Sequence, residues 1–249
     1  MDFFYELIAQ LKKEAKKKNS FFADSAVWDE FMNPGKKVEA VKVEKTVEQK
    51  AEVLTAAVPQ NTAEKIFTIE SIAEDIVACR SCPLAKVRKN PAVSYGNFKA
   101  KLMIVIESPS LLDDEENRIF SGEVGILLDK MLLAMGLKRE ETYITSIVKC
   151  RTPGNRPPSG DEVKNCRERF FDKEVEAIRP ECILAFGAGF VKNILHREGT
   201  ITTLRGKFDS YDGIPVMSTF NPAYLLRQPS AKKIVWDDLQ MVMKALGLK

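Results

Sequence analysis

The sequence lacks several features that mark common classes of protein. No stretch approaches the roughly 18 consecutive apolar residues that a membrane-spanning helix needs. At the start of the chain, MDFFYELIAQLKKEAKKK, the positive charges follow the apolar residues, whereas a secretory signal has the reverse order. No internal repeat is visible. These absences argue against the membrane-spanning, secreted and repeat classes, and they predict a cytoplasmic protein without a membrane partner.

Histidine is nearly absent and cysteine is sparse, with one His and five Cys in 249 residues. His196 falls in a helical pattern and is predicted to be an exposed helix-end residue rather than a catalytic group. Five cysteines in a reducing compartment are not expected to form a disulfide framework. Metal ligation and plain burial remain, and Cys182, inside an apolar strand pattern, is assigned to the core.

A strong excess of one charge is also missing. The formal net charge is +3, from 38 Lys and Arg against 35 Asp and Glu. The positive excess lies after residue 70, because residues 1–70 hold 11 Lys and 12 Asp or Glu. Such a mild excess permits an anionic partner without proving one.

The chain divides by composition. Apolar residues at helical spacing predict helices within 3–18 and 21–32. Residues 33–65 are rich in Lys, Glu, Val and Ala and contain no aromatic residue, which is typical of a mostly disordered linker. An N-terminal helix on such a linker is expected either to recruit a protein partner or to pack on its own domain. The predicted parts are a helical segment over 1–32, a linker over 33–66 and a main domain over 67–249.

Four apolar runs in the main domain predict buried strands. These runs span 102–108, 143–150, 182–187 and 215–220. Helical patterns surround them, at 67–79, 125–137, 161–178, 188–197 and 231–246. This alternation predicts an α/β fold with a central four-stranded parallel sheet flanked by helices. Ligands of such sheets bind beyond the C-terminal ends of the strands, which here means residues 107–110, 146–151 and 221–226.

Four cysteines have spacings typical of a metal centre. Cys79 and Cys82 are separated by two residues and precede the first strand, whereas Cys150 and Cys166 are separated by 15 residues and follow the second. Thiolates in such pairs suit either tetrahedral zinc or an iron–sulfur cluster. The spacing alone leaves both possibilities open.

Several strings in the main domain match one known family. They are CRSCPL (79–84), LMIVIESP (102–109), RIFSGEVGILLDKMLLAMGL (118–137), YITSIVKCRTPGNRPPSGDEVKNC (143–166), LRGKF (204–208) and TFNPAYLLR (219–227). On these motifs, residues 70–249 resemble the family-4 iron–sulfur uracil-DNA glycosylases. The resemblance implies a uracil-DNA-glycosylase-like fold, DNA as the partner, and hydrolysis of the N-glycosidic bond of uracil. The first 70 residues lie outside it.

The resemblance also implies a cofactor. The spacing of Cys79, Cys82, Cys150 and Cys166 matches the ligands of the family's 4Fe-4S cluster, which favours this cluster over zinc. We expect the cluster to be structural, because it would join the segment before the first strand to the loop after the second.

Three active-site motifs depart from the family pattern. The family's Gly-Glu-(Ala or Gly)-Pro-Gly is here Ile106 to Ser110, which keeps Glu107 and Pro109 but loses both glycines and their backbone freedom. Ser146 stands where the family has an asparagine that pairs with the uracil edge. Asn221 stands where the family has a histidine that donates a hydrogen bond to the departing base.

By resemblance, each motif carries an expected role. Glu107 and Asn221 are the catalytic candidates, the first for positioning water and the second for the leaving base. Ser108, Phe120 and Ser146 are expected to form the base pocket, with Phe120 stacking on the flipped base.

The remaining motif residues are expected to meet DNA. Leu225 and Leu226 resemble a loop that wedges into the duplex. Basic side chains suited to phosphate contact are Lys149, Arg151, Arg156, Arg205 and Arg227. The acidic run 113–116, in which Asp114 matches an acidic position of the family, is predicted to be a solvated turn rather than a metal site.

Two functions follow from these patterns. The retained Glu107 and Phe120 favour an active DNA glycosylase of weakened or altered base specificity. The changes at Ser146 and Asn221 favour a catalytically inactive 4Fe-4S relative that only binds nucleic acid.

Overall fold

The computed structural model describes residues 68–248. The predicted helices within 1–32, the linker over 33–66 and any protein partner of the N-terminal helix therefore lie outside the described residues. None of the described helices is both long and apolar enough to cross a bilayer.

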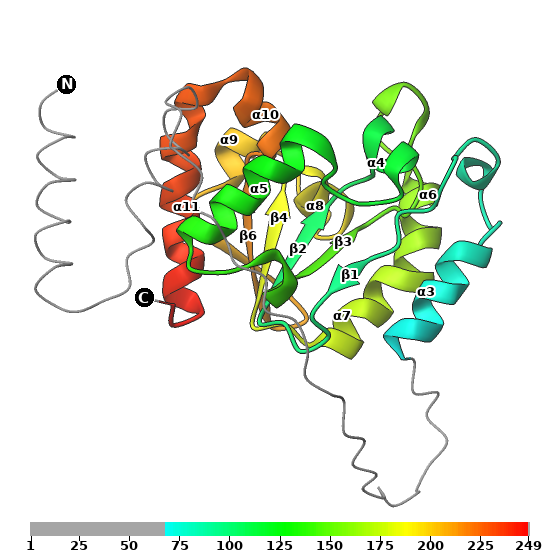
Figure 1. Ribbon diagram of the computed structural model, residues 1–249, viewed down its shortest axis with the longest axis horizontal. Coiled ribbons are helices and arrows are strands. Elements are labelled where there is room, and N and C mark those ends of the chain that lie inside the picture. Colours follow the sequence, from blue (N-terminus) through cyan, green and yellow to red (C-terminus); the bar gives the residue numbers. More distant parts are fainter. Residues whose placement is uncertain (1–67, 249) are drawn as a thin grey trace, which may run out of the picture.

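The predicted parallel sheet is present, with one strand added at each edge (Figure 1). Its order is β1-β3-β2-β4-β6-β5, and β3, β2, β4 and β6 run parallel. The outer strands β1 and β5 are antiparallel to their neighbours, so the sheet is mixed and six-stranded rather than four-stranded. The strands are β1 (Tyr95–Gly96), β2 (Leu102–Ile106), β3 (Tyr143–Ser146), β4 (Cys182–Phe186), β5 (Phe208–Tyr211) and β6 (Ile214–Thr219).

Helices cover both faces of the sheet (Figure 1). One face packs against α5 (Gly122–Ala134), α10 (Pro222–Arg227) and α11 (Lys232–Ala245). The other face packs against α3 (Ile69–Ala78), α6 (Gly160–Cys166), α7 (Asp172–Ile178) and α8 (Gly189–Asn193). We call these layers the α5 face and the α3 face. The remaining elements are α4 (Leu111–Glu116), α9 (Ile201–Leu204) and the short 3₁₀ helices Pro83–Lys86, Arg139–Glu141, Pro153–Asn155 and Pro229–Ala231.

Strands β2, β3 and β4 bury every residue, because both of their faces are covered. Alternate side chains therefore enter opposite cores: Ile104 lies in the α5-face core, whereas Met103 and Val105 lie in the α3-face core. The strands stop one to four residues earlier than the apolar runs predict. Residues 147–150, for example, are buried without belonging to β3.

The helix predicted over 161–178 is present but is not uniform. A π-helical segment, Arg167–Phe171, joins α6 to α7 immediately after Cys166. Such π-segments are rare and occur often at functional sites. Here the extra residue per turn falls between the segment that carries Cys166 and the segment that carries Glu174.

The prediction of a solvated turn at 113–116 is wrong for Asp113 and Asp114, although Glu115 and Glu116 are exposed. These residues form the end of α4, and Asp113 and Asp114 are buried. Both carboxylates accept backbone N–H groups. Asp113 takes those of Ser110 and Ser121, and Asp114 those of Lys89 and Asn90. Burial is tolerated because each carboxylate ties α4 to a neighbouring loop through hydrogen bonds.

Candidate active site and cysteine centre

Ser146, the last residue of β3, carries a buried hydroxyl group that is not satisfied. The residue has no exposed surface, and its Oγ has no hydrogen-bond partner among residues 68–248. In register, Ser146 lies beside Ile106, which lies beside Phe186, so the three side chains point to the α5 face. Buried polar groups are normally hydrogen-bonded, and an exception suggests a group awaiting a ligand or water.

Phe120 lies on the same face, in the connection between α4 and α5. Its ring is 4% exposed and meets the ring of Phe186 edge-on, with centroids 5.7 Å apart. Its backbone φ is +60°, which is unusual for a bulky residue. Strained residues of this kind cluster at binding and catalytic sites. The structure thus places Ser146 and Phe120 on the same face of the sheet.

Glu107 follows β2 directly, at the C-terminal edge of the sheet. Its Oε1 accepts a hydrogen bond of 2.7 Å from Nδ2 of Asn193, at the end of α8. Burial raises the pKa of the Glu107 carboxyl above its ordinary value, while the Asn193 hydrogen bond and the charge of Lys192 oppose the rise. Gly189 makes room for this carboxylate, because a Cβ there would lie 2.5 Å from the carboxyl carbon. Asn193 and Gly189 belong to no motif recognised in the sequence.

Ser108 follows Glu107 and is half-buried. The backbone of this loop is fixed on the β3 side, because the carbonyl oxygens of Ile106 and Glu107 accept from the N–H groups of Ile147 and Val148. The loop is therefore held against the strand that carries Ser146. Ser110, which replaces the family glycine, has φ −78° and caps α4, so this position does not need glycine.

Asn221 is the N-cap of α10. Its Oδ1 accepts the N–H of Ala223 at 2.8 Å. The amide oxygen is thereby committed, and the NH₂ group is left to donate elsewhere. The cap consequently orients the amide of a half-buried residue at the C-terminal end of β6.

The four cysteines of the predicted centre come from separate elements of the α3 face. Cys79 follows α3, Cys82 precedes the helix Pro83–Lys86, Cys150 follows β3, and Cys166 ends α6. Cys150 and Cys166 are buried in the α3-face core, and Cys79 and Cys82 are partly buried against it. Arg88 donates both to Sγ of Cys150 and to the carbonyl oxygen of Cys79. The fold thus gathers two pairs that are distant in the sequence. Cys182 is buried in β4 on the α5 face, as predicted for a core residue.

N–H groups donate to the sulfur atoms of Cys150 and Cys166. Nη1 of Arg88 lies 3.1 Å from Sγ of Cys150, and the backbone N–H of Lys149 donates to Sγ of Cys166 at 3.2 Å. Burial raises the pKa of the Cys150 thiol, which Arg88 opposes, and it raises the pKa of Cys166 to about 12. Donors of this kind favour the thiolate form that a metal centre requires. Arg88 is a residue that the motifs did not single out.

This donor set fits an inorganic centre with soft ligands. Iron–sulfur clusters are held by four cysteine thiolates and are tuned by hydrogen bonds to the sulfur atoms. Zinc also binds four thiolates. Within residues 68–248, no three Cys, His, Asp or Glu side chains converge closely enough to hold a single metal ion.

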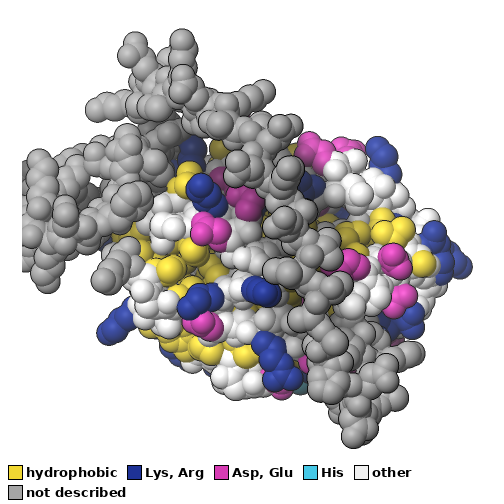
Figure 2. Space-filling view, turned by 60° about the horizontal axis from the view of Figure 1, so that its bottom comes forward, with side chains coloured by type: hydrophobic (Ala, Val, Ile, Leu, Met, Phe, Trp, Pro, Cys, Tyr) yellow, Lys and Arg dark blue, Asp and Glu magenta, His cyan; other side chains and the backbone are white. Residues whose placement is uncertain are grey.

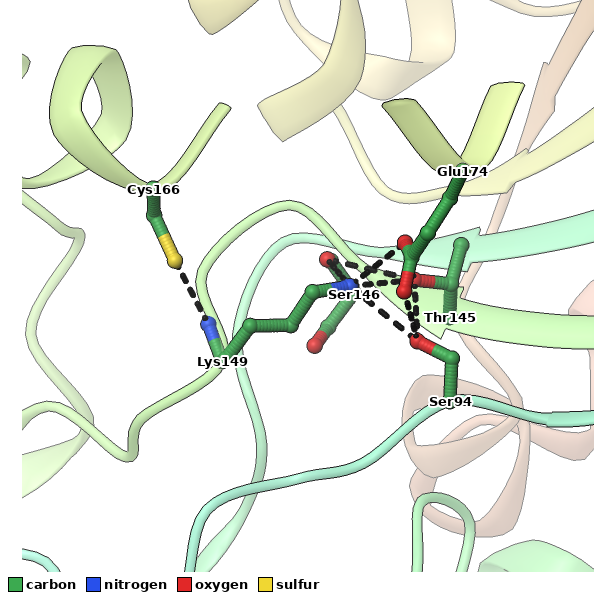
Figure 3. A network of polar contacts seen from close by, with 6 residues as sticks. All are labelled: Ser94, Thr145, Ser146, Lys149, Cys166 and Glu174. Atoms are coloured by element: carbon green, nitrogen blue, oxygen red, sulfur yellow. Dashed lines mark hydrogen bonds and ion pairs between the residues drawn. The ribbon is translucent and has the colours of Figure 1, made fainter. Parts of the chain in front are cut away.

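Lys149 is not available to phosphates, which corrects the prediction for this residue. It is 1% exposed, and its Nζ forms an ion pair of 2.7 Å with the fully buried Glu174. The same ammonium donates to Thr145 Oγ1, Ser94 Oγ and the carbonyl oxygen of Ser146 (Figure 3). Lys149 therefore connects β3 to α7 through its ammonium group, and its backbone N–H contacts the sulfur atom of Cys166.

Other residues predicted to meet DNA differ in their exposure. Leu226 and Arg227 are exposed, but Leu225 is fully buried in the α5-face core and cannot serve as a wedge without leaving it. Arg205 donates twice to Asp238, at 2.7 and 2.8 Å, which favours a structural role over phosphate contact. Arg156 is likewise paired with Glu162.

Arg151 is half-buried, and its Nε is enclosed without a partner in the described part of the chain. On the face drawn in Figure 2, the visible Lys and Arg side chains are spread among Asp and Glu rather than gathered into one patch. His196 is exposed, as predicted, although it lies beyond the end of α8 rather than in it.

Comparison with known proteins identifies the family. The model of the uracil DNA glycosylase superfamily matches residues 93–240, more than half of the chain. The chain is 33% identical to a type-4 uracil-DNA glycosylase of Archaeoglobus fulgidus over 190 residues, which cover 73% of this chain and 95% of that protein. It is 36% identical to the type-4 enzyme of Thermotoga maritima over 176 residues, 69% of this chain and 91% of the relative. The chain belongs to the uracil DNA glycosylase superfamily.

Proposed function

We propose that this protein is a DNA glycosylase that removes uracil, or another deaminated base, by hydrolysing the N-glycosidic bond in the first step of base excision repair. The single observation that carries the proposal is the unpartnered Ser146 hydroxyl, buried on the same face as the strained Phe120. A pocket that stacks and hydrogen-bonds one extrahelical base needs this combination. Membership of the superfamily supports the reaction type.

The base pocket is assigned to Phe120, Ser146 and Ser108. Phe120 would stack on the flipped base, a contact worth about 1–3 kcal/mol. The Ser146 hydroxyl would donate to or accept from the base edge. One hydroxyl discriminates less than an amide, which both donates and accepts, so we expect weakened or altered base specificity.

Glu107 is the residue proposed to position the attacking water. Its carboxylate is held by Asn193 at the edge of the sheet where α/β proteins bind ligands. The transition state of this reaction gathers positive charge on the sugar, which a nearby carboxylate stabilises. The oriented water would attack the anomeric carbon as the bond to the base breaks.

Asn221 is the residue proposed to assist the leaving base. Because its oxygen caps α10, its NH₂ group can donate to the oxygen of a departing uracil anion. A neutral amide stabilises this anion less than a charged donor, so a moderate rate is expected.

The cysteine centre is proposed to hold a 4Fe-4S cluster through Cys79, Cys82, Cys150 and Cys166. When bound, the cluster would supply a rigid cross-link between α3, the β3 loop and α6. Arg88 and the Lys149 N–H would hydrogen-bond its ligands. Visible absorption near 400 nm, with iron and sulfide in a ratio of one to one, supports the cluster. Colourless protein with stoichiometric zinc contradicts it.

DNA is the proposed partner, and the cytoplasm is the proposed location. Arg151 and Arg227 are the remaining candidates for phosphate contact, with Leu226 as the exposed residue of the wedge. Phosphate contacts of this kind weaken steeply with salt.

Incubation with uracil-containing oligonucleotides, followed by alkali, tests the function. Strand scission at the uracil position, on single- or double-stranded DNA, supports the enzyme. A panel with hypoxanthine, xanthine and thymine mismatches reveals altered specificity. Intact strands together with a gel shift would instead support the inactive nucleic-acid-binding relative, which the replacements Ser146 and Asn221 make the second candidate.

A further inference from the structure

The connection that carries Phe120 is held in a strained shape. Phe120 has φ +60°, and Asn117 and Gly122 beside it also have positive φ. A bulky side chain in this region costs free energy that its surroundings must offset. Asp113 fixes one side of the connection through the N–H of Ser121.

Two side chains from other elements hold the backbone carbonyl groups next to Phe120. The Tyr95 hydroxyl, from β1, donates to the carbonyl oxygen of Ile119 at 2.7 Å. Nη1 of Arg139 donates to the carbonyl oxygen of Phe120 at 3.3 Å and to the Tyr95 hydroxyl at 2.9 Å. These carbonyls belong to the peptide groups on either side of the Phe120 Cα. Holding both peptide groups restricts both backbone dihedrals, and therefore the direction of the ring.

Arg139 is itself anchored. The residue is 8% exposed, its Nε pairs with Asp129 at 2.5 Å, and its Nη2 donates to the carbonyl oxygen of Gly125 at 2.7 Å. Gly125 lets α5 approach the connection, because a Cβ there would lie 1.9 Å from the Phe120 oxygen. The guanidinium thus joins α5, β1 and the Phe120 carbonyl in one buried set of hydrogen bonds.

The α3 face contains a matching trio of residue types that lacks this connection. The Tyr211 hydroxyl donates to Asp172 at 2.5 Å, and Arg167 donates to both. Tyr211 is 6% exposed, whereas Tyr95 is partly buried, and each hydroxyl takes part in hydrogen bonds with an arginine. Its hydrogen bonds join members of the trio to one another instead of holding a strained carbonyl. Tyr211 is therefore a control for the general effect of losing such a hydroxyl.

We propose that Tyr95 and Arg139 are positioning residues that orient the Phe120 ring for stacking on an extrahelical base. The inference rests on the proposed function, since it names residues that prepare the same pocket. Neither residue touches the base. Both act through the backbone of Phe120.

The test compares Tyr95→Phe with Tyr211→Phe in the full-length protein. A uracil oligonucleotide with 2-aminopurine beside the uracil reports base flipping as fluorescence, and alkaline scission reports cleavage. Because the expected loss is one of stacking, Tyr95→Phe should lower kcat/KM and the flipping equilibrium by about 10-fold. Tyr211→Phe should leave kcat/KM and the flipping equilibrium within about twofold of the parent values. Urea unfolding should nevertheless show a similar loss of stability in both variants. Equal effects of the two variants on flipping overturn the proposal.

A double-mutant cycle gives the second readout. If Tyr95 acts through Phe120, then Tyr95→Phe should have no further effect on flipping in a Phe120→Leu background. If Tyr95→Phe lowers the flipping equilibrium by the same factor in the Phe120→Leu background as in the parent, the proposal is overturned. Should the parent flip the base without cleaving it, the proposed function fails while the flipping cycle still decides this inference. A parent that neither flips nor cleaves overturns both.

Discussion

Two neighbouring residues of β3 carry buried hydroxyl groups with opposite surroundings. The Thr145 hydroxyl, on the α3 face, lies within 2.6 to 2.8 Å of Glu174, Lys149 and Ser94. The Ser146 hydroxyl, on the α5 face, has no partner in the described chain (Figure 3). Both are fully buried.

The satisfied hydroxyl of Thr145 is expected to serve stability, and the unsatisfied hydroxyl of Ser146 is expected to serve ligand binding. A fully connected polar network in a buried region rigidifies the fold around it. An unsatisfied buried hydroxyl costs stability and persists where a ligand can satisfy it. We therefore expect changes in the Lys149–Glu174 network to act mainly on unfolding, and changes at Ser146 and along the C-terminal edge of the sheet mainly on rate.

The largest expected effect is on the α3 face. Glu174→Gln leaves the Lys149 ammonium buried without its counter-charge, so the free energy of unfolding should fall by about 3–5 kcal/mol. Urea denaturation measures it. The control is Glu181→Gln, which breaks an exposed pair with Lys101 (side chains 51% and 65% exposed) and should cost at most about 1 kcal/mol. Similar losses in the two variants would contradict a structural role for the buried network.

Asn221→Asp should affect rate without affecting stability. Aspartate caps a helix as well as asparagine, but it removes the NH₂ donor and adds a charge that repels a departing anion. We expect kcat to fall about 100- to 1,000-fold, while the free energy of unfolding stays within about 0.5 kcal/mol. Single-turnover kinetics and denaturation measure the two. An unchanged kcat would remove Asn221 from the mechanism.

A smaller pair of effects separates the two hydroxyls of β3. Thr145→Val breaks a satisfied network and should cost about 1–3 kcal/mol of unfolding free energy. Ser146→Ala removes an unsatisfied group and should leave stability unchanged, or raise it by up to about 1 kcal/mol. The same Ser146 variant should lower kcat/KM for uracil DNA. If Ser146→Ala destabilises as much as Thr145→Val, the contrast between the two hydroxyls is wrong.

The smallest expected effect is a displaced pH profile. Burial raises the pKa of Glu107, so the acid limb of kcat/KM should lie above the pH at which an ordinary glutamate titrates. Asn193→Leu removes a hydrogen bond that lowers this pKa, and the limb should move to higher pH with the plateau largely retained. Lys192→Met should move it the same way by less, because its charge is the weaker influence. A limb that stays in place in both variants would show that Glu107 does not set it.

The sequence predicted the inner part of the fold better than its edges. The four apolar runs form the four parallel strands because continuous burial needs continuous hydrophobicity. β1 and β5 were missed, because one has two residues and the other is partly exposed, so neither carries a strong pattern. The acidic residues Asp113 and Asp114 were misassigned because their charge suggests solvent, whereas backbone N–H groups from other loops satisfy them.

In the candidate site, the motif residues could be predicted from the sequence better than the residues that support them. Motif residues such as Glu107, Ser146 and Asn221 could be selected from the sequence because they match family motifs and lie at or after the C-terminal ends of strands that share one edge. Their supporting residues could not. Asn193 lies 86 positions from Glu107, and Arg139 lies 44 positions from Tyr95, with no spacing rule to connect them.

The sequence by itself determined the strand pattern, the two cysteine pairs and the family, because hydrophobic periodicity and short motifs are local properties of the chain. Only the tertiary structure decided which buried polar groups are satisfied, that Leu225 and Lys149 face inward, and that Arg139 and Tyr95 hold the Phe120 carbonyl region. Those outcomes depend on groups that folding brings together from distant positions, and hydrogen bonds form between neighbours in space rather than in sequence.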